Sequence, residues 1–202
     1  MSARTLALLT LSLLTPACAS LAPSGMPELA NAVVSSDFES YEVRRVGILP
    51  FSGRDLTAEQ SADLQRALHS ECSRTAPFEF VLLDANDLAE LERSDPYRRG
   101  WYEPATLIGL SRRYTLDAIL FGVVSQARFF PPQLLSLRVD MVSAETGLVI
   151  WSGSIDLDAT DPRVQQGLQK YYSGDGAEAW RVALLSPERL ASFAAFQVAS
   201  LL

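Results

Sequence analysis

The chain has 202 residues, of which 48% are hydrophobic, enough to bury the core of one domain. Apolar and aromatic residues are spread along the sequence, which excludes a wholly disordered protein. The formal net charge of −7 argues against a nucleic-acid-binding protein, because such a protein needs a basic surface.

Residues 1–17 have the pattern of a signal peptide. Arg4 supplies the positive charge, Leu6 to Leu14 form a short apolar stretch, and Ala17 is a small residue before a cleavage point. The apolar stretch is about half the ~20 residues that a membrane-spanning helix needs. No other segment is long enough, so the sequence predicts no transmembrane helix.

Cys18 directly follows this leader. The stretch Leu14-Thr15-Pro16-Ala17-Cys18 resembles a bacterial lipobox, in which a small residue precedes an obligatory cysteine, although its second and third residues are atypical. The resemblance implies that Cys18 is acylated and begins the mature protein, held in a membrane by its acyl chains. Ala19, rather than Asp, favours the outer membrane by analogy with lipoprotein sorting. The alternative is ordinary secretory cleavage near Ala17 or after Ala19, with Cys18 incidental.

Residues 18–40 are rich in small and polar residues and are predicted to be the lipidated amino terminus with a short tether. Within them, Leu29 to Val34 are predicted to form a short helix or a strand that docks onto the body. Residues 41–202 are predicted to form a single α/β domain that lies close to the membrane and faces the periplasm.

The domain is predicted to begin with a strand over Val43 to Phe51. A helix follows, because Thr57 to Gln60 have the spacing of a capping box. Its apolar stripe includes Cys72, so the thiol of this cysteine is predicted to be buried in the core. The second strand is predicted over Phe78 to Leu83.

Asp84 is predicted to cap a short helix, and Pro104 to begin another. Between them, Ser94 to Pro104 form a loop dense in arginines and aromatic residues, which are favoured as anchors of protein interfaces. The residues predicted to contact a partner are Tyr97, Arg98, Arg99, Trp101 and Tyr102. The alternative is a loop folded over the sheet, with Trp101 as its plug.

The longest apolar run outside the leader lies in Asp117 to Val124 and predicts a central strand, covered on both faces, that extends to about Arg128. Gly122 within it is predicted to allow the close packing of a helix. The stretch from Leu135 to Met141 alternates apolar and polar residues, which predicts a strand with one wet face. A turn at Glu145-Thr146-Gly147 joins it to the last strand, giving an antiparallel hairpin.

A helix is predicted to begin at Asp161-Pro162, and an apolar terminal helix at Ser186-Pro187-Glu188. The terminal helix is predicted to dock on the sheet. The sequence therefore predicts an α/β (α+β) fold with a mixed sheet of about five strands and helices packed on it. Its front half is βαβα, its back half is an antiparallel hairpin, and it ends in a helix.

No catalytic constellation is recognisable. His69 is the one histidine and has no Ser or Cys partner in any motif, and no Cys/His cluster has metal-ligand spacing. Asp156, Asp158 and Asp161 lack the glycine and terminal glutamate of a calcium loop. The chain is therefore predicted not to be an enzyme and to bind neither a metal nor a cofactor.

The succession of strands resembles that of one group of envelope lipoproteins. The most specific pieces are Leu49-Pro50-Phe51, Asp117 with Gly122, and Thr146-Gly147 followed by Trp151. The group comprises the curli-secretion-channel family, the lipoprotein activators of penicillin-binding proteins and related exopolysaccharide-export lipoproteins. They share a domain similar to the amino-terminal domain of the Tol-system propeller protein. The resemblance covers about residues 43–157.

This resemblance implies an accessory or scaffold role in envelope assembly, with the membrane and an envelope protein, or another copy, as partners. The alternative is a homo-oligomeric ring subunit of an export complex. Phe129 to Leu134 is too short for the inserted hairpin of a curli pore, and residues 18–40 are short for the tether of a penicillin-binding-protein activator. Neither specific function is therefore transferred to this chain.

Overall fold

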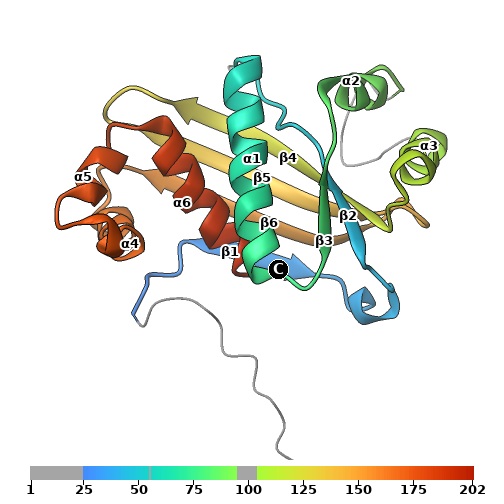
Figure 1. Ribbon diagram of the computed structural model, residues 1–202, viewed down its shortest axis with the longest axis horizontal. Coiled ribbons are helices and arrows are strands. Elements are labelled where there is room, and N and C mark those ends of the chain that lie inside the picture. Colours follow the sequence, from blue (N-terminus) through green and yellow to red (C-terminus); the bar gives the residue numbers. More distant parts are fainter. Residues whose placement is uncertain (1–24, 55, 95–103) are drawn as a thin grey trace, which may run out of the picture.

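The computed structural model describes residues 25–54, 56–94 and 104–202 (Figure 1). The strands are β1 (Ala30–Val34), β2 (Arg45–Ile48), β3 (Glu79–Leu82), β4 (Ala118–Arg128), β5 (Leu134–Ser143) and β6 (Val149–Asp158). The helices are α1 (Ala58–Thr75), α2 (Ala85–Ser94), α3 (Pro104–Tyr114), α4 (Pro162–Tyr171), α5 (Ala179–Ala183) and α6 (Pro187–Ala199), with short 3-10 helices η1 (Phe38–Ser40) and η2 (Ser173–Asp175).

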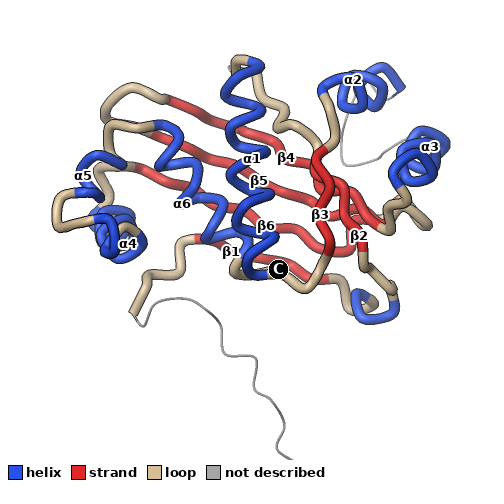
Figure 2. Tube along the Cα trace, in the orientation of Figure 1, coloured by secondary structure: helices blue, strands red, loops and turns tan. Residues whose placement is uncertain are grey.

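The six strands form one mixed sheet in the order β1-β6-β5-β4-β2-β3 (Figure 2). Strand β2 is parallel to both β3 and β4, whereas β4, β5, β6 and β1 are antiparallel neighbours. This confirms the predicted α+β fold, with a βαβα front half, an antiparallel hairpin and a terminal helix.

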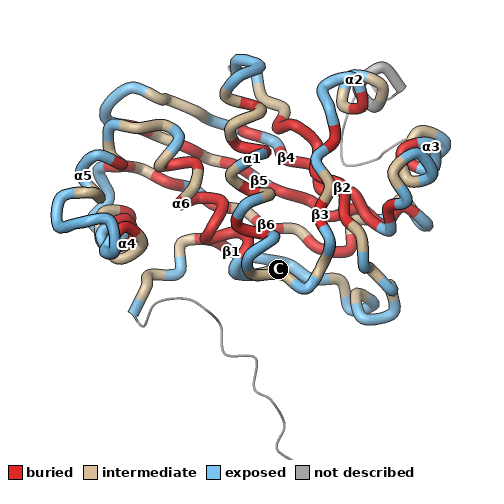
Figure 3. The backbone as a smooth tube through the Cα atoms, viewed as in Figure 1, coloured by how far each residue is buried: buried red, intermediate tan, exposed pale blue. Residues whose placement is uncertain are grey.

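Strand β4 is the central strand, as predicted, and it contributes to two separate cores. Ala118, Leu120 and Val124 belong to the larger core, beneath α1, α4 and α6. Ile119 and Phe121 alternate with them and belong to the smaller core, with residues of α3. Because successive strand residues point to opposite faces, the sheet is covered on both faces at β4. Buried residues accordingly concentrate along the middle of the sheet (Figure 3).

Local signals place the helix starts where the sequence predicts them. The Thr57 side chain accepts a hydrogen bond from the Gln60 amide (3.2 Å), and the Gln60 side chain accepts one from the Thr57 amide (3.0 Å). Ser186 caps α6 by accepting a hydrogen bond from the Arg189 amide. Each cap satisfies amide groups that the first turn of a helix leaves unpaired.

The sixth strand, β1, comes from the stretch that the sequence assigned to a short helix or a strand. It pairs antiparallel with β6, from Ala30 opposite Ile155 to Val34 opposite Trp151. The chain therefore joins the sheet before residue 41, and β1 lies at the outer edge of the sheet.

The structure corrects the prediction that Gly122 allows the close packing of a helix. A Cβ atom there would lie 2.4 Å from two ring carbons of Phe51, so the close neighbour is an aromatic ring and not a helix. The ring reaches the strand because Ser52 continues along β4, bonding through its amide to the Gly122 carbonyl (2.9 Å). Phe51 then fills the space between β4 and α1, where the Ser61 hydroxyl donates to the Phe51 carbonyl.

Cys72 is buried in the larger core, as the sequence predicts, with 1% of its surface exposed. Burial raises the pKa of its thiol to about 12, and the carboxylate of Glu71 adds to the rise. No helix in the described part of the chain combines the length and apolarity needed to cross a membrane.

Replacing Gly122 tests its contact with Phe51. We expect Gly122→Ala to lower the free energy of unfolding by about 1–3 kcal/mol, because the added methyl group overpacks the core. The matched control is Gly109→Ala in α3, where a Cβ would meet nothing within 4 Å; there we expect a gain of about 0.5–1 kcal/mol. Urea unfolding measures both, and equal effects of the two changes would contradict the assignment.

The raised pKa of Cys72 predicts a loss of stability in alkali. The thiol ionises near pH 9 in the unfolded chain and near pH 12 in the folded one, so the unfolded state binds fewer protons between these values. The free energy of unfolding therefore falls as pH rises through this window, by up to about 1.4 kcal/mol per pH unit. Urea unfolding across this range should show a shallower decline in Cys72→Ala; an unchanged slope would be inconsistent with this source.

Candidate functional site

The residues predicted to carry function lie outside the described part of the chain. They are Cys18 and the five loop residues Tyr97, Arg98, Arg99, Trp101 and Tyr102. What the structure describes is their surroundings: the two helices on either side of residues 95–103, and the place where the chain after Cys18 meets the domain.

The helices α2 and α3 flank residues 95–103 at one end of the long axis of the molecule (Figure 1). As predicted, Asp84 caps α2, and its carboxylate accepts hydrogen bonds from the amides of Asn86 (2.7 Å) and Asp87 (3.1 Å). Leu107 and Leu110 attach α3 to the smaller core. The helices that precede and follow residues 95–103 are therefore fixed to the domain.

A buried carboxylate ties these two helices together. Asp87 of α2 is 1% exposed and accepts hydrogen bonds from the Arg113 guanidinium (2.7 Å) and the Tyr114 hydroxyl (2.8 Å) of α3. It also accepts one from the Asp84 amide (3.0 Å), which completes the cap of α2. The hydrogen bond to this carboxylate raises the pKa of the Tyr114 hydroxyl, and burial adds to the rise. The cluster is fully paired, so its evident role is to position α2 against α3.

A groove of about 600 Å³ lies beside α3. Ile108 and Arg112 of α3 form one wall, and the chain entering β2 and the β5–β6 turn form the rest. Asp117 lies in it, but its carboxylate accepts hydrogen bonds from the amides of Arg44 and Arg45, both at 2.9 Å. The Asp117 carboxylate therefore fastens the start of β2 to the start of β4.

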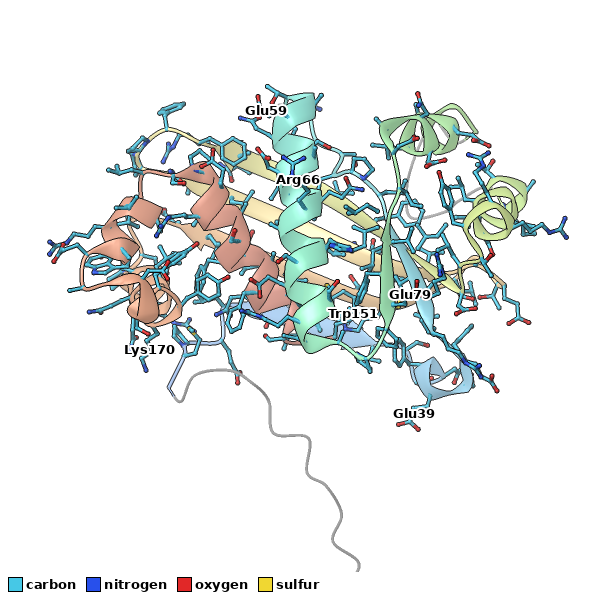
Figure 4. The ribbon with its side chains drawn as sticks, viewed as in Figure 1. Glu39, Glu59, Arg66, Glu79, Trp151 and Lys170 are labelled. Atoms are coloured by element: carbon cyan, nitrogen blue, oxygen red, sulfur yellow. The ribbon has the colours of Figure 1, made fainter. Side chains whose placement is uncertain are left out.

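At the opposite end, a clamp of three side chains holds the first described residues. Gln197 of α6 donates to the Pro27 carbonyl (3.2 Å) and accepts from the Leu29 amide (3.1 Å). Arg163 of α4 donates to the Glu28 carbonyl (3.0 Å), and Lys170 donates to the Gly25 carbonyl. Lys170 lies at the end of α4, near where the described chain begins (Figure 4). The chain is therefore bound to the domain from residue 25 onward.

Sequence reasoning did not find this clamp. Gln197 is 168 residues from Leu29 and 170 residues from Pro27 in the sequence. No local sequence pattern identifies a glutamine that bonds to such a distant segment. The apolar stripe of the terminal helix is visible in the sequence, but the polar residue within it is recognisable only once the helix is docked.

Within residues 25–54, 56–94 and 104–202, no group of three or more His, Cys, Asp or Glu residues is placed to hold a metal ion. The half-buried His69 lies on α1. The acidic residues buried among the helices, Glu71 and Asp87, are each paired with a tyrosine and an arginine.

No protein-family model matches the chain. No curated protein matches its sequence either. Solved structures do show similarity to it.

Three such structures are similar in fold at low identity. PelC from Paraburkholderia phytofirmans, a dodecamer, is 9% identical, with 81% of this chain and 94% of that chain covered and a TM-score of 0.46. Lipoprotein GNA1162 from Neisseria meningitidis is 15% identical, with 56% of this chain and 79% of that chain covered and a TM-score of 0.40. The LpoB C-terminal domain from Salmonella enterica is 16% identical, with 57% of this chain and 84% of that chain covered and a TM-score of 0.38. All lie below a TM-score of 0.5, so they carry no argument about function. The expected resemblance to the curli-secretion channel and the Tol domain stays a prediction.

Replacing the buried acid tests the tie between α2 and α3. In Asp87→Asn the amide nitrogen cannot accept a hydrogen bond and the charge is lost, so we expect a loss of about 1.5–3 kcal/mol of stability. Hydrogen exchange should speed up in α2 and α3 and stay unchanged in α1. The control Glu90→Gln affects the half-exposed partner of Arg113 (3.2 Å) and should cost less than about 1 kcal/mol. Equal exchange in the two variants would refute the role of Asp87.

Proposed function

We propose that the chain is a non-enzymatic lipoprotein, anchored in the outer membrane through acylated Cys18 and facing the periplasm. It acts as an accessory or scaffold in envelope assembly: secretion, polysaccharide export or the regulation of a peptidoglycan synthase. The observation that carries the proposal is the cysteine that directly follows a short apolar leader with a small residue before it. Acyl chains on such a residue hold a protein durably on a membrane.

The described part of the chain supports an anchor-and-contact mechanism. The clamp on residues 25–29 leaves only a short stretch between Cys18 and the domain, so the anchor restrains the position of the folded body. The paired Asp87 fixes the helices on both sides of residues 95–103. A loop with Trp101 and two tyrosines, carried on rigid helices, is suited to contact a protein partner.

The second candidate is a homo-oligomeric ring subunit of an export complex, and the edge strand β1 favours it. β1 contains no charged residue, and Val33 and Val34 are 73% and 52% exposed. An uncharged edge strand can pair with a strand of another chain. The mass of the acylated protein in detergent discriminates the candidates: a large homo-oligomer favours the ring, and a monomer or dimer the accessory.

Replacing Cys18 tests the anchor. We expect Cys18→Ser to lack the mass of the acyl chains and to be absent from the outer-membrane fraction of a density gradient, because serine cannot form the lipid linkage. The control Cys72→Ala changes the other cysteine, which is buried, and should keep both the acyl mass and the location. A Cys18→Ser protein that is unacylated and still correctly sorted to the outer membrane would eliminate the proposed anchor.

A further inference from the structure

The position of the clamp determines which end of the domain is held near the anchor. Cys18 and Gly25 are seven residues apart, and a fully extended chain of that length spans at most about 25 Å. Gly25 is bonded to Lys170 of α4, so the anchor of the proposed function restrains the α4 end of the domain. The following inference rests on that proposed function.

The same end carries exposed apolar side chains. Phe130 in the β4–β5 connection is 68% exposed, Leu185 between α5 and α6 is 65% exposed, and Val182 of α5 is 52% exposed. The β4–β5 connection, α4, α5 and the start of α6 all lie at one end of the long axis (Figure 1), and much of the first and third is exposed (Figure 3).

Contacts among the elements bring together the segments that carry these three residues. Phe129, next to Phe130, lines a small cavity together with Pro187, two residues after Leu185. Arg189 of α6 donates to the Ala179 carbonyl of α5 (3.4 Å). The β4–β5 connection, α5 and the first turn of α6 are therefore packed together, and Phe130, Val182 and Leu185 project from that packed unit.

We propose that the surface formed by Phe130, Val182 and Leu185 at this end of the domain lies against the phospholipid leaflet in which Cys18 is anchored. The three side chains enter the boundary between headgroups and acyl chains, where apolar groups are stabilised. Two arginines here are paired with acids, Arg181 with Glu178 and Arg189 with Asp175, and the guanidinium of a third, Arg128, lies over the Phe130 ring, 5.9 Å from its centroid. The half-buried Trp180, with the Arg181 guanidinium over its ring, suits a position at such an interface.

This orientation directs α2, α3 and the groove beside α3 away from the membrane, because they lie at the other end of the long axis (Figure 1). The β5–β6 turn lies at that end too, and its Leu148 is 55% exposed. Leu148 is thus an apolar residue of comparable exposure that the proposed surface does not include.

The experiment uses the acylated full chain in vesicles of phosphatidylethanolamine and phosphatidylglycerol. Single cysteines replace Phe130, Val182, Leu185 or, as the control, Leu148, and each carries an environment-sensitive nitrobenzoxadiazole label. Cys72 is buried and Cys18 is blocked by its lipid, so only the introduced thiol reacts. A lipid with a spin label high on its acyl chain quenches labels that reach the leaflet, and aqueous iodide quenches those that do not.

We expect emission at positions 130, 182 and 185 to shift to shorter wavelength and to be lost with the spin-labelled lipid, whereas position 148 is quenched by iodide. Aqueous emission at all four positions in acylated protein would overturn the surface and leave the anchor intact. A shift at the three positions without quenching by the lipid would also overturn it, because a protein then covers them. A mass spectrum with unmodified Cys18 would overturn the proposed function, and this surface with it.

Discussion

The architecture depends on one strand that pairs in two different ways. β4 is parallel to β2 on one side and antiparallel to β5 on the other, so it joins a half built by helical crossovers to a half built by hairpins. The carboxylate of Asp117 fixes the register at the start of this strand by accepting hydrogen bonds from the backbone amides of Arg44 and Arg45. Because β4 is apolar on both faces, helices must cover it from both sides, and α1 and α3 each contribute to one core.

Features of the fold that depend on neighbouring residues could be predicted from the sequence. Three helix caps lie where the sequence predicts them, because a cap joins residues only two or three positions apart. They are formed by Thr57 together with Gln60, by Asp84 and by Ser186. The alternation of apolar and polar residues in β5 likewise reflects the two faces of a sheet, although Asp140, expected on its wet face, is buried. Helix or strand could not be decided for β1, since its conformation depends on pairing with β6, more than a hundred residues away.

Dependence on residues that are distant in the sequence also explains the wrong prediction for Gly122 and the failure to predict the clamp. Gly122 was expected to admit a helix, but a glycine in a strand indicates only that something lies close, and the neighbour here is Phe51. The clamp through Gln197 is undetectable for a similar reason: glutamine is common, and its partners are backbone atoms of a distant segment. For Cys18 and Tyr97 to Tyr102, the sequence supplies the residues and the structure supplies only the elements that border them.

Buried acids are the residues in which a catalytic reading would first be sought, and their partners argue for another role. Glu71 of α1 accepts a hydrogen bond from the Tyr171 hydroxyl of α4 (2.6 Å) and forms an ion pair with Arg74. Asp87 of α2 accepts a hydrogen bond from the Tyr114 hydroxyl of α3 and forms an ion pair with Arg113 of α3. The Glu71 carboxylate thus joins α1 to α4 through Tyr171, while Arg74 pairs with it from within α1, and the Asp87 carboxylate joins α2 to α3 through both Tyr114 and Arg113. Both oxygens of each carboxylate have partners, so the two sites stabilise helix packing. In the part of the domain that the structure describes, these two carboxylates therefore hold helices in place.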